Sequence, residues 1–179
     1  GAHRGHFTVW AARQRADAEI HAYEPDPANA DECEAALRHD GLADRVVVHR
    51  EAVAARDGLG RFRPAARSDA GSLAHLSLSA TGASAGSEGD RTVATVGLVT
   101  VLARCRARTV FLKMAAEGAA PAAFAALAGA APAAAGRIAA AALEWHPPGA
   151  NDVDVRRSLA GLGFDTMIQV AGADLIGGR

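Results

Sequence analysis

The chain has 179 residues, half of them hydrophobic, and its 19 basic and 20 acidic residues leave a formal net charge of -1. A chain of this length can bury one sizeable core, so we expect a single domain over residues 1–179. Its basic residues are scattered and form no stripe or patch, which argues against nucleic acid and anionic membranes as direct partners.

The longest apolar stretch does not indicate a membrane span. PAAFAALAGAAPAAAGRIAAAALEW is rich in alanine and is interrupted by Gly, Pro and Arg, whereas a spanning helix needs about 20 consecutive apolar residues. We see no signal-peptide pattern. The two cysteines, Cys33 and Cys105, form no C-x-x-C motif, which suits buried, reduced thiols. We therefore expect a cytoplasmic protein, and the sequence does not predict its oligomeric state.

The opening sequence GAHRGHFTVWAAR places Gly1 and Gly5 directly before an apolar segment. Apolar residues recur there at helical spacing, which predicts a helix over residues 5–14. The glycines are either a turn that cradles a cofactor or a flexible N-terminus, and G-x-x-x-G is a weaker pattern than G-x-G-x-x-G. AEIHAYE, at residues 18–24, is mostly apolar and ends in an acid. This segment predicts a strand.

Residues 27–39 carry the clearest helix signals in the chain. Asp26 is a suitable N-cap, Pro27 occupies the first helical position, and Gly41 lies just beyond the expected end. DRVVVHREAVA, at residues 44–54, is β-branched in its centre. It predicts the next strand.

The rest of the chain alternates between strand and helix patterns around one long loop over residues 66–91, which is rich in Ser, Gly, Ala and Thr. The expected elements are a turn and strand in RDGLGRFRP, a strand entering a short helix in RTVATVGLVTVLARC, a strand in RTVFLKM, a helix over residues 119–129, a strand in GRIAAAALEWH, a helix in DVDVRRSLAGLGF closed by Gly163, and a strand in FDTMIQV that can pair with ADLIGG as a terminal edge hairpin. This alternation predicts an α/β fold with a doubly wound sheet.

Charged side chains close four of the predicted strands, and ligands of open α/β sheets bind outside the carboxyl ends of strands. Glu24 lies 19 residues after Gly5, close to the roughly 20-residue interval at which an acid binds ribose hydroxyls in dinucleotide folds. The alternative is a solvated acid beside Pro25. The strand-end residues are Glu24, Glu51, Lys113 with Glu117, and Glu144 with His146.

These motifs together resemble the FkbM-type family of S-adenosylmethionine-dependent methyltransferases. GAHRGHFTVWAAR resembles its glycine loop, D-x-G-A-N-x-G, and AYEPDPANADECEAALRHDGLADRVVVHREAVA is similar to its acid-ended second strand, E-P-x-P helix, G-L turn and third strand. GSLAHLS resembles its serine loop, VATVGLVTVLAR its V-x-T-L-D-D-L segment, FLKMAAEGA its L-K-I-D-V-E-G-A-E motif, LEWHPP its E-x-H-P strand end, and LAGLGF the helix before its last strands. The resemblance spans essentially the whole chain and is most specific over residues 22–54.

The resemblance implies a Rossmann-like fold of the class I methyltransferase type, with S-adenosylmethionine as cofactor and a hydroxylated small molecule, of sugar or polyketide type, as acceptor. The long loop over residues 66–91 would help to close over that acceptor. The implied cofactor residues are Gly1, Ala2, His3 and Gly5 at the methionine portion, Glu24 with Pro25 at the ribose, and Glu51 with Ala52 beside the adenine.

Several positions depart from the family pattern. The family's first strand, and the acid two residues before Gly1, lie outside this sequence, and His3 stands where the family usually has Asn. In the fourth-strand motif Ala115 replaces the family's Asp. Losing that carboxylate removes one charge-assisted hydrogen bond, worth roughly 1.5 to 3 kcal/mol. The other lost acids are those replaced by Ala120 in the fourth-strand motif and by Val99 and Thr100 in the L-D-D-L segment.

Transfer of a methyl group to a hydroxyl needs in-line alignment and a base that removes the hydroxyl proton. His146 is the candidate base, unless it simply ends a strand before two prolines. Glu144 and Glu117 are expected to orient it or replace it. Lys113 either holds the acceptor or the cofactor carboxylate, or is a strand-end lysine whose stem covers apolar surface.

Two other functions remain open at this point. One is a non-catalytic methyltransferase-like domain that serves as a partner-binding or vestigial module, which the lost acids favour. The other is the same fold with a different nucleotide ligand. His3 and His6 are three residues apart but have no further ligand at a fitting spacing, so we expect no metal site.

Overall fold

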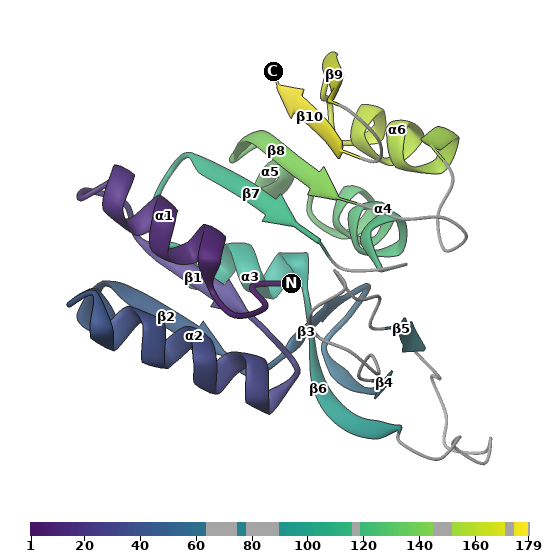
Figure 1. The fold of residues 1–179 in the computed structure, drawn as a ribbon. Coiled ribbons are helices and arrows are strands. Elements are labelled where there is room, and N and C mark those ends of the chain that lie inside the picture. The colour runs from purple at the N-terminus through teal and green to yellow at the C-terminus, as the bar shows by residue number, and fades with distance from the viewer. Residues whose placement is uncertain (64–74, 78–89, 116–118, 145–151, 171–173, 179) are drawn as a thin grey trace. The chain divides into compact units, whose positions relative to one another are not determined.

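The computed structural model describes residues 1–63, 75–77, 90–115, 119–144, 152–170 and 174–178. It divides into two compact units, Gly1–Ala52 and Val53–Arg179, which are described separately below. The described residues form a mixed α/β structure with six α-helices and three small sheets. Figure 1 labels the helices and strands along the chain. The expected α/β class is therefore confirmed at that level, and the single domain stays a prediction.

The first unit is built around a strand–helix–strand connection. Its elements are α1 (His6–Gln14), β1 (Ile20–Tyr23), α2 (Pro27–His39), the short 3-10 helix η1 (Ala43–Arg45) and β2 (Val46–His49). The strands β1 and β2 are parallel, and their register pairs Ile20 with Val46 and Tyr23 with His49. The two helices and the strand predicted in the first 39 residues are confirmed.

The start of α2 explains why its boundaries were predictable. The Asp26 carboxylate accepts hydrogen bonds from the backbone N–H groups of Ala28 and Asn29, at 2.9 and 3.1 Å. Pro27 occupies the first helical turn, where a missing N–H leaves no bond unmade. Gly41 has φ of +68° just beyond the helix, a conformation that favours glycine. All three signals are local to the sequence.

The core of the first unit lies between its helices and one face of the β1–β2 pair. Cys33 of α2 is fully buried there, and burial is the main reason why the pKa of its thiol is raised. This location confirms the expectation of a buried thiol for Cys33. The core residues are Ala12, Ala22, Cys33, Leu37, Leu42 and Val46.

The single strand predicted over residues 44–54 is wrong. The chain leaves β2 at His49 and resumes extended pairing in β3 (Ala52–Ala54), which belongs to a different sheet. Glu51, between the two strands, lies outside both. The β-branched pattern is continuous across a change of sheet, so the pattern alone could not show the break.

The second unit contains a four-stranded sheet of order β7-β8-β10-β9, in which β7 and β8 are parallel and β10 is antiparallel to both of its neighbours. The predicted pairing of the last two strands is confirmed. However, β9 and not β10 is the outer strand. The bounds are β7 (Val110–Met114), β8 (Ile138–Glu144), β9 (Thr166–Val170) and β10 (Asp174–Gly178).

A second sheet in this unit has the order β3-β6-β4-β5, with antiparallel pairing of β4 to both β5 and β6. Antiparallel pairing was not expected here, since the sequence suggested one doubly wound sheet. The remaining bounds are β4 (Gly58–Arg63), β5 (His75–Ser77), β6 (Arg91–Gly97), α3 (Leu98–Arg104), α4 (Ala120–Ala130), α5 (Pro132–Ala135) and α6 (Asp152–Gly161).

The core of the second unit is rich in alanine and packs α3, α4 and α6 with β7 and β8. Phe124 and Leu127 of α4 and Ile138 of β8 are at most 1% exposed. Small alanine side chains allow close approach of helix and strand, so the apolar stretch here is core. Within the described ranges, no helix is long and apolar enough to cross a membrane.

Candidate functional site

The loop before α1 lies against the carboxyl end of β1. The backbone nitrogens of Gly1 and Ala2 donate to the carbonyl oxygen of Tyr23, the last residue of β1, at 2.8 and 3.0 Å. The Gly5 N–H donates to the Ala2 carbonyl at 3.0 Å and closes the turn. The residues predicted to contact the methionine portion of the cofactor therefore form an ordered turn at a strand end.

Two residues of this turn have left-handed backbone conformations. His3 has φ of 53° and Gly5 has φ of 84°. A Cβ at Gly5 would lie 2.6 Å from Cys33 Sγ and 3.1 Å from Cys33 Cα. Glycine is thus needed at position 5 for its φ and for the close approach of α2. The atoms that approach Gly5 closely belong to Cys33 of α2, a helix of the same unit.

Glu24 connects this turn to the start of α2. Its side chain is buried, and the two carboxylate oxygens accept hydrogen bonds from the N–H groups of His3, at 2.7 Å, and Asp26, at 3.0 Å. The Glu24 N–H donates to the His49 carbonyl at 2.9 Å. An ionised carboxylate has about four acceptor positions, and donors among the described residues fill two of them. The alternative of a solvated acid beside Pro25 is wrong, because Glu24 is only 5% exposed.

The other predicted cofactor residues lie in the same unit. Pro25 is partly buried between Glu24 and Asp26. Glu51 follows β2, and its carboxylate lies 3.9 Å from Nδ1 of His49. Ala52 is buried at the start of β3. All eight predicted cofactor residues fall within Gly1–Ala52.

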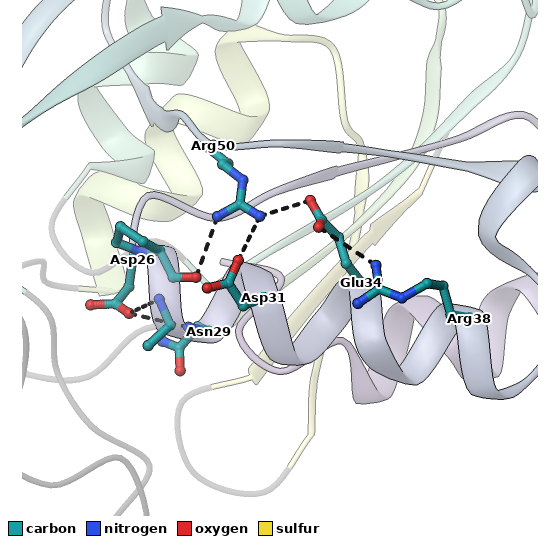
Figure 2. Close-up of polar contacts among 8 residues, drawn as sticks. Asp26, Asn29, Asp31, Glu34, Arg38 and Arg50 are labelled. Carbon is teal, nitrogen blue, oxygen red and sulfur yellow. Dashed lines mark hydrogen bonds and ion pairs between the residues drawn. The ribbon is translucent and has the colours of Figure 1, made fainter.

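An exposed charge network, which the sequence reading did not single out, holds the end of β2 against α2, as Figure 2 shows. Arg50 donates to the carboxylates of Asp31, at 2.7 Å, and Glu34, at 3.0 Å. These bonds raise the pKa of the Arg50 guanidinium. Glu34 also lies 3.9 Å from Arg38, one helical turn later. The spacing of Asp31, Glu34 and Arg38 on one helix face was the available signal.

Two of the four predicted catalytic residues are described, and both belong to the second unit. Lys113 in β7 is paired in register with Ala142 of the parallel strand β8. Glu144 is the last residue of β8, two positions beyond Ala142. Because side chains alternate along strands, Lys113 and Glu144 lie on the same face of the sheet near its carboxyl edge. Glu117 and His146 lie outside the described residues, as does most of the loop over residues 66–91.

The positions where the family's acids are replaced have structural roles of their own. Ala120, the first residue of α4, is buried in the core. Thr100 of α3 donates its hydroxyl to Asp57 at 2.7 Å, and the Gly97 N–H donates to the same carboxylate at 2.7 Å. These two bonds, the backbone one first, lower the pKa of Asp57. Asp57 therefore caps α3 from the turn before β4.

The described residues contain no group of three or more His, Cys, Asp or Glu side chains that could hold a metal ion. No protein-family model matches the sequence, and no curated protein or solved structure matches it either.

Proposed function

We propose that the protein is an S-adenosylmethionine-dependent methyltransferase that methylates a hydroxyl group of a small molecule. The observation that carries the proposal is the buried carboxylate of Glu24 at the carboxyl end of β1, bonded to His3 in the turn before α1. An acid at this position accepts the ribose hydroxyls in folds that bind a nucleotide at strand ends.

We also infer a doubly wound, Rossmann-like fold. Two connections support it, because β1–α2–β2 and β7–α4–α5–β8 both join parallel strands through helices. Parallel strands require such crossovers. A parallel pair with helices between its strands is the repeating unit of these folds.

The residues of the first unit fit the chemistry of the cofactor. Glu24 keeps acceptor positions for ribose hydroxyls beyond its two backbone donors. The turn formed by Gly1, Ala2, His3 and Gly5 precedes a helix N-terminus, where an anion such as an amino-acid carboxylate is favoured. Glu51 and Ala52 follow β2 and would flank the adenine.

When bound, S-adenosylmethionine supplies an electrophilic methyl group on a sulfonium. The chain has to align the acceptor oxygen with that group, exclude water and remove the hydroxyl proton. Lys113 and Glu144 share one face near the carboxyl edge of β7 and β8, where Glu144 can accept a proton and Lys113 can orient an anionic or hydroxyl oxygen. His146 and Glu117 remain the other proposed bases.

A second candidate function is a non-catalytic binding module of the same fold. The observation that favours it is the burial of Ala120 in the alanine-rich core, where a family member's acid could not be accommodated without rearrangement. Under this reading the chain binds the nucleotide but transfers no methyl group.

Isothermal titration with S-adenosylmethionine tests the proposal. We expect binding that Glu24→Gln weakens by about tenfold or more, because a charge-assisted hydrogen bond becomes a neutral one. Glu34→Gln, on the solvent side of α2, is the matched control and should leave binding unchanged. No heat at about 1 mM cofactor, from a chain that is folded by circular dichroism, would contradict the proposal.

Two further measurements separate the alternatives. Binding without methyl transfer to any hydroxylated acceptor would favour the non-catalytic module. If a different nucleotide raised the melting temperature and S-adenosylmethionine did not, the result would favour the same fold with a different nucleotide ligand.

A further inference from the structure

Two histidines on adjacent parallel strands lie with their ring edges in contact. Nδ1 of His21, in β1, lies 2.9 Å from Nε2 of His49, in β2. The ring centroids are 5.2 Å apart and the ring planes differ by 10°. A nitrogen contact this short at that centroid spacing places the rings end to end, so the two nitrogens share one hydrogen bond along their lone-pair directions.

A carboxylate lies at the outer nitrogen of each ring. Glu19 Oε1 is 3.0 Å from Nε2 of His21, and Glu51 Oε2 is 3.9 Å from Nδ1 of His49. The four side chains therefore lie in the order Glu19–His21–His49–Glu51 across the two strands, with hydrogen-bond distances at the first two contacts and a longer, ion-pair separation at the third.

Two further groups of residues 1–52 lie next to this series, the ring of Tyr23 and the guanidinium of Arg50. The Tyr23 ring, directly across from His49 in the register, stacks on it at 4.4 Å. Arg50 follows His49 and turns to the opposite side of the strand, where it binds Asp31 and Glu34 of α2. The histidine pair is thus flanked by carboxylates and a phenol ring.

The geometry limits how many protons the two rings can hold. A nitrogen-to-nitrogen hydrogen bond needs one donor and one acceptor. If both outer nitrogens carry hydrogens toward Glu19 and Glu51, and one inner nitrogen carries the bridging hydrogen, three protons occupy the four ring nitrogens. The pair then has one positive charge between two carboxylates. A fourth proton places two N–H groups against each other and breaks the bridge.

We propose that His21 and His49 form an acid-sensitive clamp between β1 and β2. In the closed clamp the pair holds a single bridging proton, and uptake of one more proton opens the clamp and loosens the strand pair. The exposed fractions of the side chains, 10% for His21 and 18% for His49, restrict solvent but leave a path for protons. The inference concerns this strand pair alone and does not depend on the proposed function.

The test compares the full chain at about pH 7.5 and about pH 5.5, on either side of the range in which imidazole ordinarily titrates. Long-range proton–nitrogen spectra of the chain labelled with 15N-histidine should show three N–H groups on the two rings at the higher pH and four at the lower. Amide hydrogen exchange over residues 20–24 and 46–50, corrected for the intrinsic pH effect, should lose about tenfold or more of its protection.

Two variants complete the test. His21→Asn removes the bridge, so its strand amides should already be less protected at the higher pH and show no further loss on acidification. His39→Asn, at the exposed end of α2, should keep the loss seen in the unaltered chain. Equal protection of the unaltered chain at both pH values would overturn the proposal, as would an undiminished acid effect in His21→Asn. If His21→Asn does not fold, spectra of the unaltered chain that show two independently titrating rings would overturn it.

Discussion

The two units of the chain differ in where they place polar side chains. Among the residues whose burial is described, the buried polar ones are Thr8, Glu24, Asp26 and Thr95. Three of these belong to Gly1–Ala52, although that unit is the smaller. The first unit thus accepts buried carboxylates and satisfies them with backbone N–H groups.

The second unit keeps its core apolar and uses its polar groups at the ends of elements. Arg137 donates to the carbonyl oxygens of Leu102, Cys105 and Ala107, where α3 ends. Asp57 satisfies the start of the same helix. Burying a carboxylate is unfavourable unless it is bonded, and in the first unit the N–H groups of His3 and Asp26 supply those bonds to Glu24. Lys113 and Glu144 lie in the strands β7 and β8 of this unit.

Among the substitutions considered, Gly5→Ala is expected to cause the largest loss in the free energy of unfolding, and it acts on the first unit. Gly5→Ala adds a Cβ at φ of 84°, 2.6 Å from Cys33 Sγ. The left-handed conformation and the overpacking together should lower the free energy of unfolding by about 2–4 kcal/mol. Urea unfolding followed by Trp10 fluorescence, in a Trp145→Phe background that leaves one tryptophan, measures the effect.

Substitutions at two other glycines separate the effect of the left-handed conformation from the effect of the contact with Cys33. Gly41 has φ of +68° with no atom within 4 Å of an added Cβ, so Gly41→Ala should show only the conformational loss, about 1–2 kcal/mol. Gly129 lies in α4 of the second unit, also with nothing within 4 Å, and Gly129→Ala should gain no more than about 1 kcal/mol. If Gly5→Ala and Gly41→Ala lowered the free energy of unfolding equally, the contact with Cys33 would add nothing to the cost of the substitution at Gly5.

The sequence predicted the two helices and the first strand of the first unit well because their signals are local. The cap, proline and glycine around α2 lie within a few residues of the helix ends, and Glu24 follows its strand directly. The burial of Glu24 was harder to foresee, since the same acid beside Pro25 could equally have faced solvent. The 19-residue spacing from Gly5 places Glu24 at the same strand end as the glycine turn, because one helix and one strand return the chain to that edge, and its role toward a ribose stays a prediction.

The features that the sequence did not predict depend on register between distant segments. Three features are of this kind: the place of β10 between β8 and β9, the antiparallel pairing of β4 with β6, and the contact of His21 with His49. In each of them, the local sequence pattern of one segment does not indicate which other segment it contacts. Asp57 was overlooked for the same reason, because its bonds to Gly97 and Thr100 cross 40 or more residues. Hydrophobic periodicity identifies an element but not its neighbour.

The Asp57 cap should give a smaller, pH-dependent effect in the second unit. Its two hydrogen bonds hold the folded-state pKa below the ordinary value, so the stabilisation is present at higher pH and is lost as the pH falls through the folded-state pKa. Asp57→Asn should lower the free energy of unfolding by about 1 kcal/mol from about pH 5 upward, and by less below about pH 4.

The measurement is urea unfolding of both chains across that pH range, followed by circular dichroism. Thr100→Val removes one of the two donors and should have a part of the effect. A difference between Asp57→Asn and the unaltered chain that stays constant down to about pH 3 would contradict this role for the carboxylate.

The smallest effect is expected in the first unit, at the exposed network of Arg50. Its partners Asp31 and Glu34 have side chains that are 68% and 33% exposed, and exposed ion pairs contribute little after screening. Arg50→Gln should therefore leave the melting temperature unchanged within error at physiological salt, in contrast to Gly5→Ala at the other side of α2. A loss as large as that of Gly5→Ala would mean that α2 is held to β2 by surface charge as much as by the packing of Cys33 and Leu37.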